Sequence, residues 1–314
     1  DSYFKQLLSI LFLAGAFFIA GCSSDDNTVA QDPDPLPEDP VPEDPPPVTV
    51  IAPDDLTGLW EGTMLTQDGD EYNVAFVFYW PDGVDEGRVM AVTFIGDTPH
   101  ALIDAGYTDD ARAANITSEY VIGSENAQGS FPQVYDFSTD LVVSDKGGWI
   151  YLDLDGNILT GSGHFDRDFT ITLEYSMQNA NDSVVTDLVG TWTDDAASRG
   201  WDDAADGTTL TVGSDGAMSA LATSGTCQGD GVVVDIVGFN IYILTDADNT
   251  GTEVIVSNCG TRDSNLGPAH VDGDYSGLGA LLIDESGNQT LVTILSERGG
   301  DTPSMAMYNE FIKN

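Results

Sequence analysis

The chain from residue 55 onward is dominated by short runs in which apolar and polar residues alternate. The clearest run is DFTITLEYSM (168–177), whose period of two is typical of a strand with one buried face. Residues 208–222 and 279–295 each predict two strands joined by a tight turn. Further turns are predicted at WPDG (80–83), SDKGG (144–148) and DLDGN (153–157). Residues 100–114 depart from this pattern and predict a short helix or an irregular insertion.

Consecutive short strands joined by tight turns predict an all-β fold made of antiparallel meanders. A closed, barrel-like sheet would leave no exposed edge strand. Rolled open sheets and sandwiches give a similar sequence pattern and remain the alternatives. Hydrophobic residues make up 41% of the chain, which is too many for a disordered acidic protein.

The sequence DLxGxW occurs twice, as DLTGLW at 55–60 and as DLVGTW at 187–192. Each copy precedes a long segment rich in predicted strands, which indicates two similar domains in tandem. We place these domains at residues 55–182 and 186–314, because the junction around 179–183 is polar and turn-prone.

A Gly-x-Trp in the first strand of an antiparallel meander resembles the opening of calycins, the lipocalin and fatty-acid-binding barrels. The matching residues are Gly58 and Trp60 in the first copy and Gly190 and Trp192 in the second. The resemblance covers three residues per domain, and it implies that each tryptophan closes one end of a barrel. It also implies an interior that takes a small apolar ligand. The second calycin motif, Thr-Asp-Tyr, has a loose counterpart in Gly273-Asp274-Tyr275.

The amino-terminal segment predicts export and lipid anchoring. Residues 7–21 are uncharged and follow Lys5, as in the hydrophobic region of a secretory signal. Ile19-Ala20-Gly21-Cys22 resembles the lipobox of bacterial lipoproteins. This implies that residues 1–21 are a cleaved signal peptide and that Cys22 carries a diacylglycerol and an acyl chain such as palmitate. By the same resemblance, Ser23 favours the outer membrane. An ordinary signal, or a short membrane helix with an incidental cysteine, is the alternative.

Residues 22–54 are the predicted link between this anchor and the first domain. Nine of the 14 prolines of the chain lie in this stretch, and acidic residues fill most of the gaps between them. Proline removes backbone donors and fixes φ, so we expect an extended acidic spacer without helix or sheet. A proline-rich ligand for a partner domain is the alternative.

The chain is strongly acidic, with 53 Asp and Glu against 9 Lys and Arg and a formal net charge of -44. Such a surface repels phosphate backbones, which argues against nucleic acid as a partner, and it also repels anionic lipid head groups. Membrane attachment therefore depends on the lipid anchor. The charge fits solubility in a salty medium, and binding of divalent cations is the alternative.

Two acidic segments carry oxygen-bearing side chains at alternating positions, as calcium requires. The candidate ligands are Asp153, Asp155 and Asn157 in the first segment and Asp246, Asp248 and Glu253 in the second. Neither segment matches the twelve-residue calcium loop, and both fit ordinary turns between strands. We therefore expect no required cofactor, with Ca²⁺ as the alternative.

The chain contains three cysteines. With Cys22 assigned to lipid, Cys227 and Cys259 are an even pair in an exported protein and predict a disulfide. A metal site or a catalytic thiol is the alternative, but neither residue has a CxxC partner or a local histidine.

The sequence contains no recognisable catalytic motif. His100, His164 and His270 lack metal-ligand spacing, and neither HExxH nor GxSxG is present. A Ser-His-Asp set that only the fold brings together remains open. We therefore expect a protein that is not an enzyme, with an envelope hydrolase as a third possibility behind two binding functions.

Aromatic residues raise the question of sugar binding. Trp201, in the polar stretch SRGWDDAADG, is the candidate for an exposed ring, whereas Trp80 and Trp149 adjoin strand runs and are expected in the core or at a barrel end. The expected function is that of an outer-membrane lipoprotein acting as a non-enzymatic binding or structural module of the cell envelope, with a small apolar ligand. A surface adhesion or carbohydrate-binding protein, with or without Ca²⁺, is the alternative.

Overall fold

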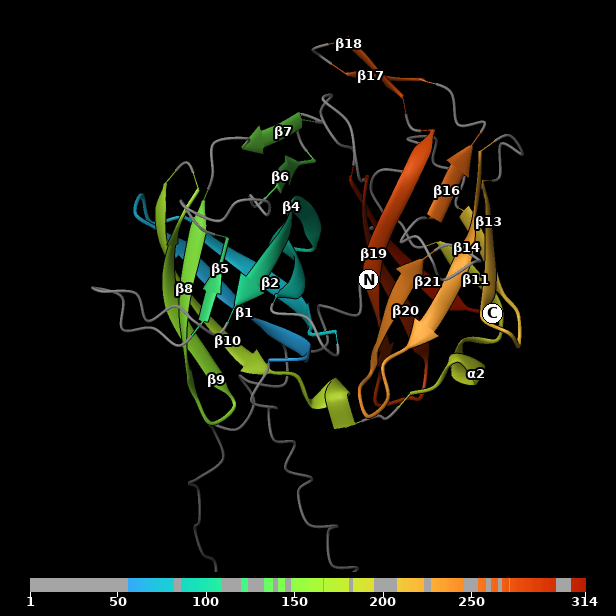
Figure 1. Ribbon diagram of the computed structural model, residues 1–314, viewed down its shortest axis with the longest axis horizontal. Helices are drawn as coiled ribbons and strands as arrows, with labels where there is room; N and C mark the ends of the chain where they lie inside the picture. Colours follow the sequence, from blue (N-terminus) through green and yellow to red (C-terminus); the bar gives the residue numbers. More distant parts are fainter. Residues whose placement is uncertain are drawn as a thin grey trace, which may run out of the picture. The chain divides into compact units, whose positions relative to one another are not determined.

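The computed structural model of the protein describes most of the chain after residue 55, with gaps. The described ranges are 56–81, 86–108, 120–123, 133–137, 141–144, 148–165, 167–180, 183–194, 208–222, 227–245, 254–257, 261–264, 267–270, 272–297 and 306–314. These residues form an all-β protein with two closed eight-stranded antiparallel barrels in tandem (Figure 1). The predicted fold class and its barrel-like form are thereby confirmed.

The first barrel contains strands β1 to β10, coloured from blue to green in Figure 1. Their bounds are β1 (Gly58–Thr66), β2 (Glu71–Tyr79), β3 (Gly87–Ile95), β4 (Thr98–Thr108), β5 (Tyr120–Ile122), β6 (Gln133–Asp136), β7 (Leu141–Ser144), β8 (Trp149–Asp155), β9 (Ile158–His164) and β10 (Asp168–Tyr175). The ring runs β1-β2-β3-β4-β5-β8-β9-β10 and closes where β10 pairs with β1. β6 also pairs with β4 and carries β7 on its other edge.

The second barrel repeats this topology after a short connector that contains η1 (Met177–Ala180) and α2 (Val185–Leu188). Its strands are β11 (Gly190–Asp194), β12 (Thr208–Val212), β13 (Ala217–Ala222), β14 (Gln228–Asp235), β15 (Ile241–Thr245), β16 (Val254–Ser257), β19 (Gly273–Ile283), β20 (Gln289–Glu297) and β21 (Ala306–Lys313). The ring runs β11-β12-β13-β14-β15-β19-β20-β21, and β21 closes it on β11. β16 continues the position of β15 between β14 and β19, and β17 (Thr261–Ser264) pairs with β18 (Gly267–His270) as a separate ribbon.

The two DLxGxW copies have the same local geometry. Gly58 and Gly190 have φ values of 131° and 135°, a region that a residue with a Cβ rarely adopts. In each copy the tryptophan indole nitrogen donates to the backbone oxygen of the motif leucine four residues earlier, at 2.8 Å. The rings of Trp60 and Trp192 are fully buried, each near the start of the first strand of its barrel.

Each barrel has its own hydrophobic core of inward-facing side chains. In β10 the buried and exposed residues alternate without interruption, as the period of two predicts. The predicted hairpins at 208–222 and 279–295 are present as β12–β13 and β19–β20. Within the described ranges, no helix combines the length and apolar character needed to cross a membrane.

A second set of buried apolar residues belongs to neither core. It includes Met90, Val92, Phe94 and Leu102 of the first barrel and Leu278, Ile294 and Tyr308 of the second. Residues Val50–Asn314 form one compact unit, in which β2 contacts β19 and β4 contacts β21. The rings of Phe94 and Tyr308 meet edge to face with their centroids 5.5 Å apart. The barrels therefore share an apolar seam built from the outward faces of these strands.

One ion pair lies in this seam. Arg88 Nη2 is 2.9 Å from Asp104 Oδ2, and both side chains are largely buried. Arg88 also donates to the Ser276 hydroxyl at 3.1 Å, and the Ser296 hydroxyl donates to Asp104. A buried ion pair is tolerated when further hydrogen bonds satisfy its polar atoms, and here the second barrel supplies them.

The connector between the barrels is fixed to both of them. The Asn179 side chain donates to the Leu59 carbonyl at 2.8 Å and accepts from the Leu59 amide at 3.0 Å. Gln178 makes the same two-bond clamp on the backbone of Ile283, at 3.1 and 3.0 Å. These two amides extend the hydrogen bonding of a strand in each barrel, so Gln178 and Asn179 fix the described start of the junction to both barrels.

The prediction of a helix or an irregular insertion at 100–114 is wrong for the described part of that segment. Strand β4 (Thr98–Thr108) occupies it and pairs with β3 along its length. The register shifts between Thr93 and Phe94, which marks a β-bulge or irregularity in this pairing. Both faces of β4 carry buried residues, so the strand does not show the simple alternation of a half-exposed strand.

Candidate functional site

A pocket lies at the end of the first barrel opposite Trp60 and has a volume of about 230 Å³. It is lined by Met64, Thr66, Tyr72, Thr93, His100, Ala101, Ile103, Val134, Asp136, Phe165, Arg167 and Phe169. These residues come from the end of β1, the starts of β2, β4 and β10, the end of β3, and β6. The buried tryptophan and the pocket thus occupy opposite ends of the barrel.

The pocket walls are mainly apolar and aromatic. Phe165 and Phe169 are stacked with ring centroids 5.5 Å apart, and Phe169 lies so close to Gly163 that a Cβ there would be 2.3 Å from the ring. Tyr72 and His100 stack with a centroid distance of 5.4 Å and an interplanar angle of 12°. These pairs give the pocket flat walls that suit a ring or a short chain.

The rim of the pocket carries more acidic than basic groups. Arg167 Nη1 lies 3.1 Å from Asp68 Oδ2 and 3.8 Å from Asp70 Oδ2, with all three side chains exposed. Asp136 is a further acidic residue of the lining. The positive charge of Arg167 is therefore balanced at the rim, and the site offers little attraction to an anionic ligand.

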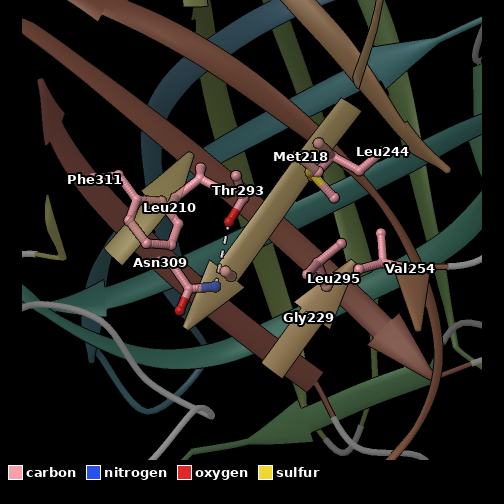
Figure 2. Close-up of a pocket in the computed structure, with 10 residues that line it drawn as sticks. Leu210, Met218, Gly229, Leu244, Val254, Thr293, Leu295, Asn309 and Phe311 are labelled. Atoms are coloured by element: carbon pink, nitrogen blue, oxygen red, sulfur yellow. Dashed lines mark hydrogen bonds between the residues drawn. The ribbon is translucent and has the colours of Figure 1, made fainter. Parts of the chain in front are cut away.

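The described residues of the second barrel enclose only a small cavity. This cavity has a volume of about 20 Å³ and is lined by Leu210, Met218, Ala220, Gly229, Leu244, Val254, Thr293, Leu295, Asn309 and Phe311 (Figure 2). Asn309 Nδ2 donates to Thr293 Oγ1 at 3.2 Å, shown as the dashed line in Figure 2, and Asn309 Oδ1 is buried without a hydrogen-bond partner. A cavity of this size has room for about one water molecule and none for an organic ligand.

A half-buried ionisable group, Glu61, lies outside the pocket where the connector meets β1. Burial raises the pKa of Glu61 above its ordinary value of 4.5, and a hydrogen bond from Ser176 partly offsets this effect. The Ser176 hydroxyl donates to Glu61 Oε2 at 2.6 Å. This carboxyl lies on the outer side of the strand that carries Trp60, so it does not belong to the pocket.

The first predicted calcium segment lies at the turn between β8 and β9. Asp153 and Asp155 are exposed and Asn157 is half-buried. No group of three or more His, Cys, Asp or Glu is close enough to hold a metal ion in the described part of the chain. Asp246, Asp248 and Glu253 of the second segment lie outside the described residues. Calcium binding remains a prediction.

Several other predicted residues also lie outside the described ranges. They include the signal peptide, Cys22, the proline-rich spacer, Trp201 and Cys259. Cys227 is described and is buried just before β14. Its predicted disulfide with Cys259, and the lipid on Cys22, remain predictions.

The structure separates the two tryptophans expected in the core or at a barrel end. Trp80 packs against the core of the first barrel, with its ring 5.2 Å from that of Tyr107, which confirms the prediction. Trp149 is not part of the core, because the neighbouring Ile150 and Leu152 of β8 take the inward positions, and it lies half-buried at the first residue of β8. Trp149 therefore faces outward.

Sequence reasoning did not identify the pocket residues. His100 stood out only as one of three isolated histidines, and Tyr72, Phe165 and Arg167 were not singled out at all. The available signal was positional, because these residues lie at strand ends far from the DLxGxW tryptophan. Using it requires the order of the strands around the barrel, which the sequence pattern does not supply.

Comparison with known proteins identifies no family for this chain. No family model and no curated protein matches the chain. A crystal structure of a protein of unknown function from the DUF3598 family of Nostoc punctiforme PCC 73102 is similar over 82% of this chain and 96% of its own, at 11% identity and a TM-score of 0.25. A likeness with this TM-score carries no argument about the fold or the function of this chain.

Proposed function

We propose that the protein is a non-enzymatic binding module of the cell envelope and that its first barrel binds a small ligand with an apolar body. The observation that carries this proposal is the pocket of about 230 Å³ opposite Trp60. Sites for drug-sized molecules usually measure about 300–1,000 Å³, so the expected ligand is smaller. The second barrel, with about 20 Å³ of free space, serves as a structural partner.

The lining favours a ligand whose polar group is uncharged or positive. Asp68, Asp70 and Asp136 outnumber Arg167 around the pocket, and the whole chain has a formal net charge of -44. The stacked Tyr72 and His100 offer an aromatic face to the apolar body of the ligand. An anion would approach against the field of the protein.

Three aromatic probes of nearly equal size test this proposal: phenethylamine, phenethyl alcohol and phenylacetate. We expect the cation and the neutral alcohol to bind with a Kd below about 1 mM by calorimetry, which corresponds to about -4 kcal/mol, and the anion to bind more weakly. Absence of binding by all three probes would overturn the proposal. Tighter binding of phenylacetate would overturn the assignment of charge.

A pocket-filling variant locates the binding site. Ala101 lines the pocket, and Ala101→Leu should abolish binding of the two favoured probes because its side chain occupies the space. The matched control is Thr172→Leu, which places the same side chain on the exposed face of β10 and should leave binding unchanged. Binding that survives Ala101→Leu would place the probes elsewhere.

The location of the protein in the cell is part of the same proposal. Lipid on Cys22 would anchor the protein to the outer membrane, and residues 22–54 would hold the barrels away from the bilayer. Mass spectrometry of the protein extracted from its own membrane should find a chain that begins at Cys22, carries lipid and contains a Cys227–Cys259 disulfide. A mature chain without lipid would remove the anchor from the proposal and leave the pocket in place.

A further inference from the structure

The pairing of β3 with β4 has one irregularity, and it lies beside the pocket. Thr93 is paired with Ala101 and Phe94 with Pro99, so His100 is an extra residue of β4 at this point. An extra residue in one strand of an antiparallel pair is a β-bulge, which re-aims side chains and is over-represented next to active sites. Both Thr93 and His100 line the pocket. The bulge therefore shapes one wall of the ligand site.

The bulge turns the His100 side chain into the pocket. The inward residues of β4 beyond this point include Ile103 and Ala105, which belong to the core of the first barrel. Strict alternation would place His100 on the opposite face, with Leu102 in the seam. Instead its ring lines the pocket and stacks on Tyr72 with the centroids 5.4 Å apart. The extra residue thus gives the pocket one of its aromatic walls.

The bulge also engages Thr93, whose hydroxyl keeps an unused proton. Thr93 Oγ1 accepts from the backbone amide of Ala101 at 3.1 Å, and Thr93 is only 3% exposed. A hydroxyl carries one proton besides its acceptor lone pairs, and no residue in the described ranges accepts the proton of Thr93. A buried donor without a partner is unfavourable, so a ligand that displaces water from this side chain must supply an acceptor of its own.

The charges around the pocket determine which kind of acceptor suits the site. Asp136 lines the pocket, Asp68 and Asp70 face Arg167 at the rim, and the chain has a formal net charge of -44. A carboxylate has acceptor atoms but approaches against this field. An ammonium group has three donors and no acceptor, so it leaves the Thr93 proton unpaired. A neutral oxygen acceptor, as in a ketone, ester, ether or alcohol, meets both conditions.

We propose that Thr93 is the specificity-determining residue of the pocket and that the ligand is a small neutral molecule with an apolar body and an oxygen acceptor. This inference rests on the proposed function of the first barrel and narrows the class of its ligand. Thr93 donates to the ligand oxygen inside the pocket. The apolar body lies against the stacked aromatic pairs of the lining.

Two ligands of nearly identical shape test the role of the acceptor. Acetophenone carries a carbonyl oxygen where isopropenylbenzene carries a methylene group, and both molecules are neutral. Their Kd values are measured by ligand-observed NMR titration in the unmodified protein and in Thr93→Val, which removes the hydroxyl and keeps a branched side chain. We expect Thr93→Val to weaken acetophenone about five- to tenfold and not to weaken isopropenylbenzene, because only the ketone pairs with the hydroxyl.

Two further variants separate this role from a structural one. If Thr93 only supported the Ala101 amide, its loss would weaken both ligands alike, so the readout is the change in the ratio of the two Kd values. Thr93→Ser keeps the hydroxyl and should retain the ratio of the unmodified protein. Thr172→Val makes the same exchange on the exposed face of β10 and should leave both Kd values unchanged. Unfolding curves show that each variant is folded.

Infrared spectroscopy of bound acetophenone gives a second measurement, which needs no variant. A hydrogen bond lowers the stretching frequency of a carbonyl group. We therefore expect the isotope-labelled carbonyl to absorb at a lower frequency in the pocket than in cyclohexane.

Two results would overturn the role of Thr93: a bound carbonyl that absorbs as it does in cyclohexane, or a Thr93→Val variant that leaves the ratio of the two Kd values unchanged. The proposed function would survive either result if phenethyl alcohol binds and Ala101→Leu abolishes that binding. If acetophenone, isopropenylbenzene and phenethyl alcohol all fail to bind, both proposals are wrong. The failure of this inference can therefore be distinguished from the failure of the proposed function.

Discussion

The two barrels use different residues to cover the tryptophan of the opening motif. Tyr175 pairs with Trp60 in the first barrel, and Lys313 pairs with Trp192 at the equivalent position of the second. The Tyr175 ring packs against Trp60 with centroids 5.0 Å apart, whereas Lys313 Nζ lies 5.2 Å from the Trp192 ring centroid. An aromatic edge and a cation are both attracted to the face of an indole, so either residue can close the barrel end.

The two cores also differ in which of two neighbouring strands carries the large side chain. Ile150 on β8 is paired with Gly163 on β9, and at the equivalent level of the second barrel Gly277 on β19 is paired with Leu295 on β20. The large residue has moved to the neighbouring strand while the combined volume is similar. Close packing constrains the sum of the side-chain volumes more than the identity of each residue. This explains why only the short opening motif is visibly repeated in the sequence.

The described strands differ in length at the end of the barrel away from the tryptophan. β1 and β2 have nine residues each, whereas the described parts of β11 and β12 have five. Met64 and Tyr72, which line the pocket, therefore have no counterpart among the described residues of the second barrel.

The largest expected effect comes from removing either tryptophan. Trp60→Ala and Trp192→Ala should each lower the free energy of unfolding by about 3–5 kcal/mol, because both lose a fully buried ring. Urea unfolding at neutral pH measures the loss, with Trp→Phe at each site as the control that retains most of the ring. If one of the two alanine variants lost less than about 1 kcal/mol, the two openings would not play the same role.

Substitution of the opening glycine should destabilise the two barrels to different extents. Gly58→Ala and Gly190→Ala both force a left-handed backbone on a residue with a Cβ, which costs about 1–3 kcal/mol. At Gly58 the new Cβ would also lie 2.7 Å from the Tyr175 ring, whereas at Gly190 the nearest atom is 3.8 Å away, in Lys313. We therefore expect the larger loss of stability for Gly58→Ala. Equal losses in urea unfolding would show that the packing difference has no effect.

Substitutions of the residues that cover the tryptophans should give a smaller difference in the free energy of unfolding. Lys313→Met should cost about 1–2 kcal/mol, because it removes the 2.6 Å hydrogen bond from Nζ to the Asp187 carbonyl and the contact of the cation with Trp192. Tyr175→Phe keeps the ring on Trp60 and loses a long hydrogen bond, 3.4 Å to the Thr57 carbonyl, so it should cost less. The comparison is made by urea unfolding at low salt, and a larger cost for Tyr175→Phe would contradict it.

The smallest expected effects are opposite pH dependences in the two barrels. Burial raises the pKa of Glu61, so the folded state holds a proton that the unfolded state releases, and stability falls as pH rises from about 4.5 through the raised pKa. Glu61→Gln should remove this fall. Hydrogen bonds from Asn288 lower the pKa of the exposed Asp284, so its contribution is present above pH 3.8 and is lost as pH falls through the lowered pKa.

Unfolding curves of Glu61→Gln and Asp284→Asn across this pH range measure both effects. The stability of Glu61→Gln relative to the unmodified protein should rise as pH rises. Asp284→Asn should lose the most stability at neutral pH and the least in acid. If both variants changed in the same direction with pH, the burial of Glu61 would not be the cause of its shifted pKa.

Several elements could be predicted because their causes are local. The alternation in 168–177 places one face of β10 in the core, and the turn residues at 153–157 and 285–288 end their strands without help from distant parts of the chain. β4 could not be predicted in this way. Its inner face lines the first barrel and its outer face enters the seam, so both sides are buried and the alternation disappears.

The candidate sites depended on tertiary structure for the same reason. Trp149 adjoins an apolar strand, and only the inward positions of Ile150 and Leu152 show that it faces outward. Arg167 and Tyr72 are 95 residues apart in sequence (167 minus 72) and meet at the pocket because β10 closes the ring on β1. No local pattern records which strand ends become neighbours.

The sequence by itself determined the all-β class, the tandem arrangement and the two tryptophan openings, since strand periodicity, turn chemistry and a repeated motif act within a few residues. It also determined the acidic charge of the chain. The tertiary structure decided where the pocket lies among the described residues, that Trp149 faces outward and how the barrels are joined. Those properties depend on ring closure, strand length and exchanged side-chain volumes, which are relations among residues far apart in the chain.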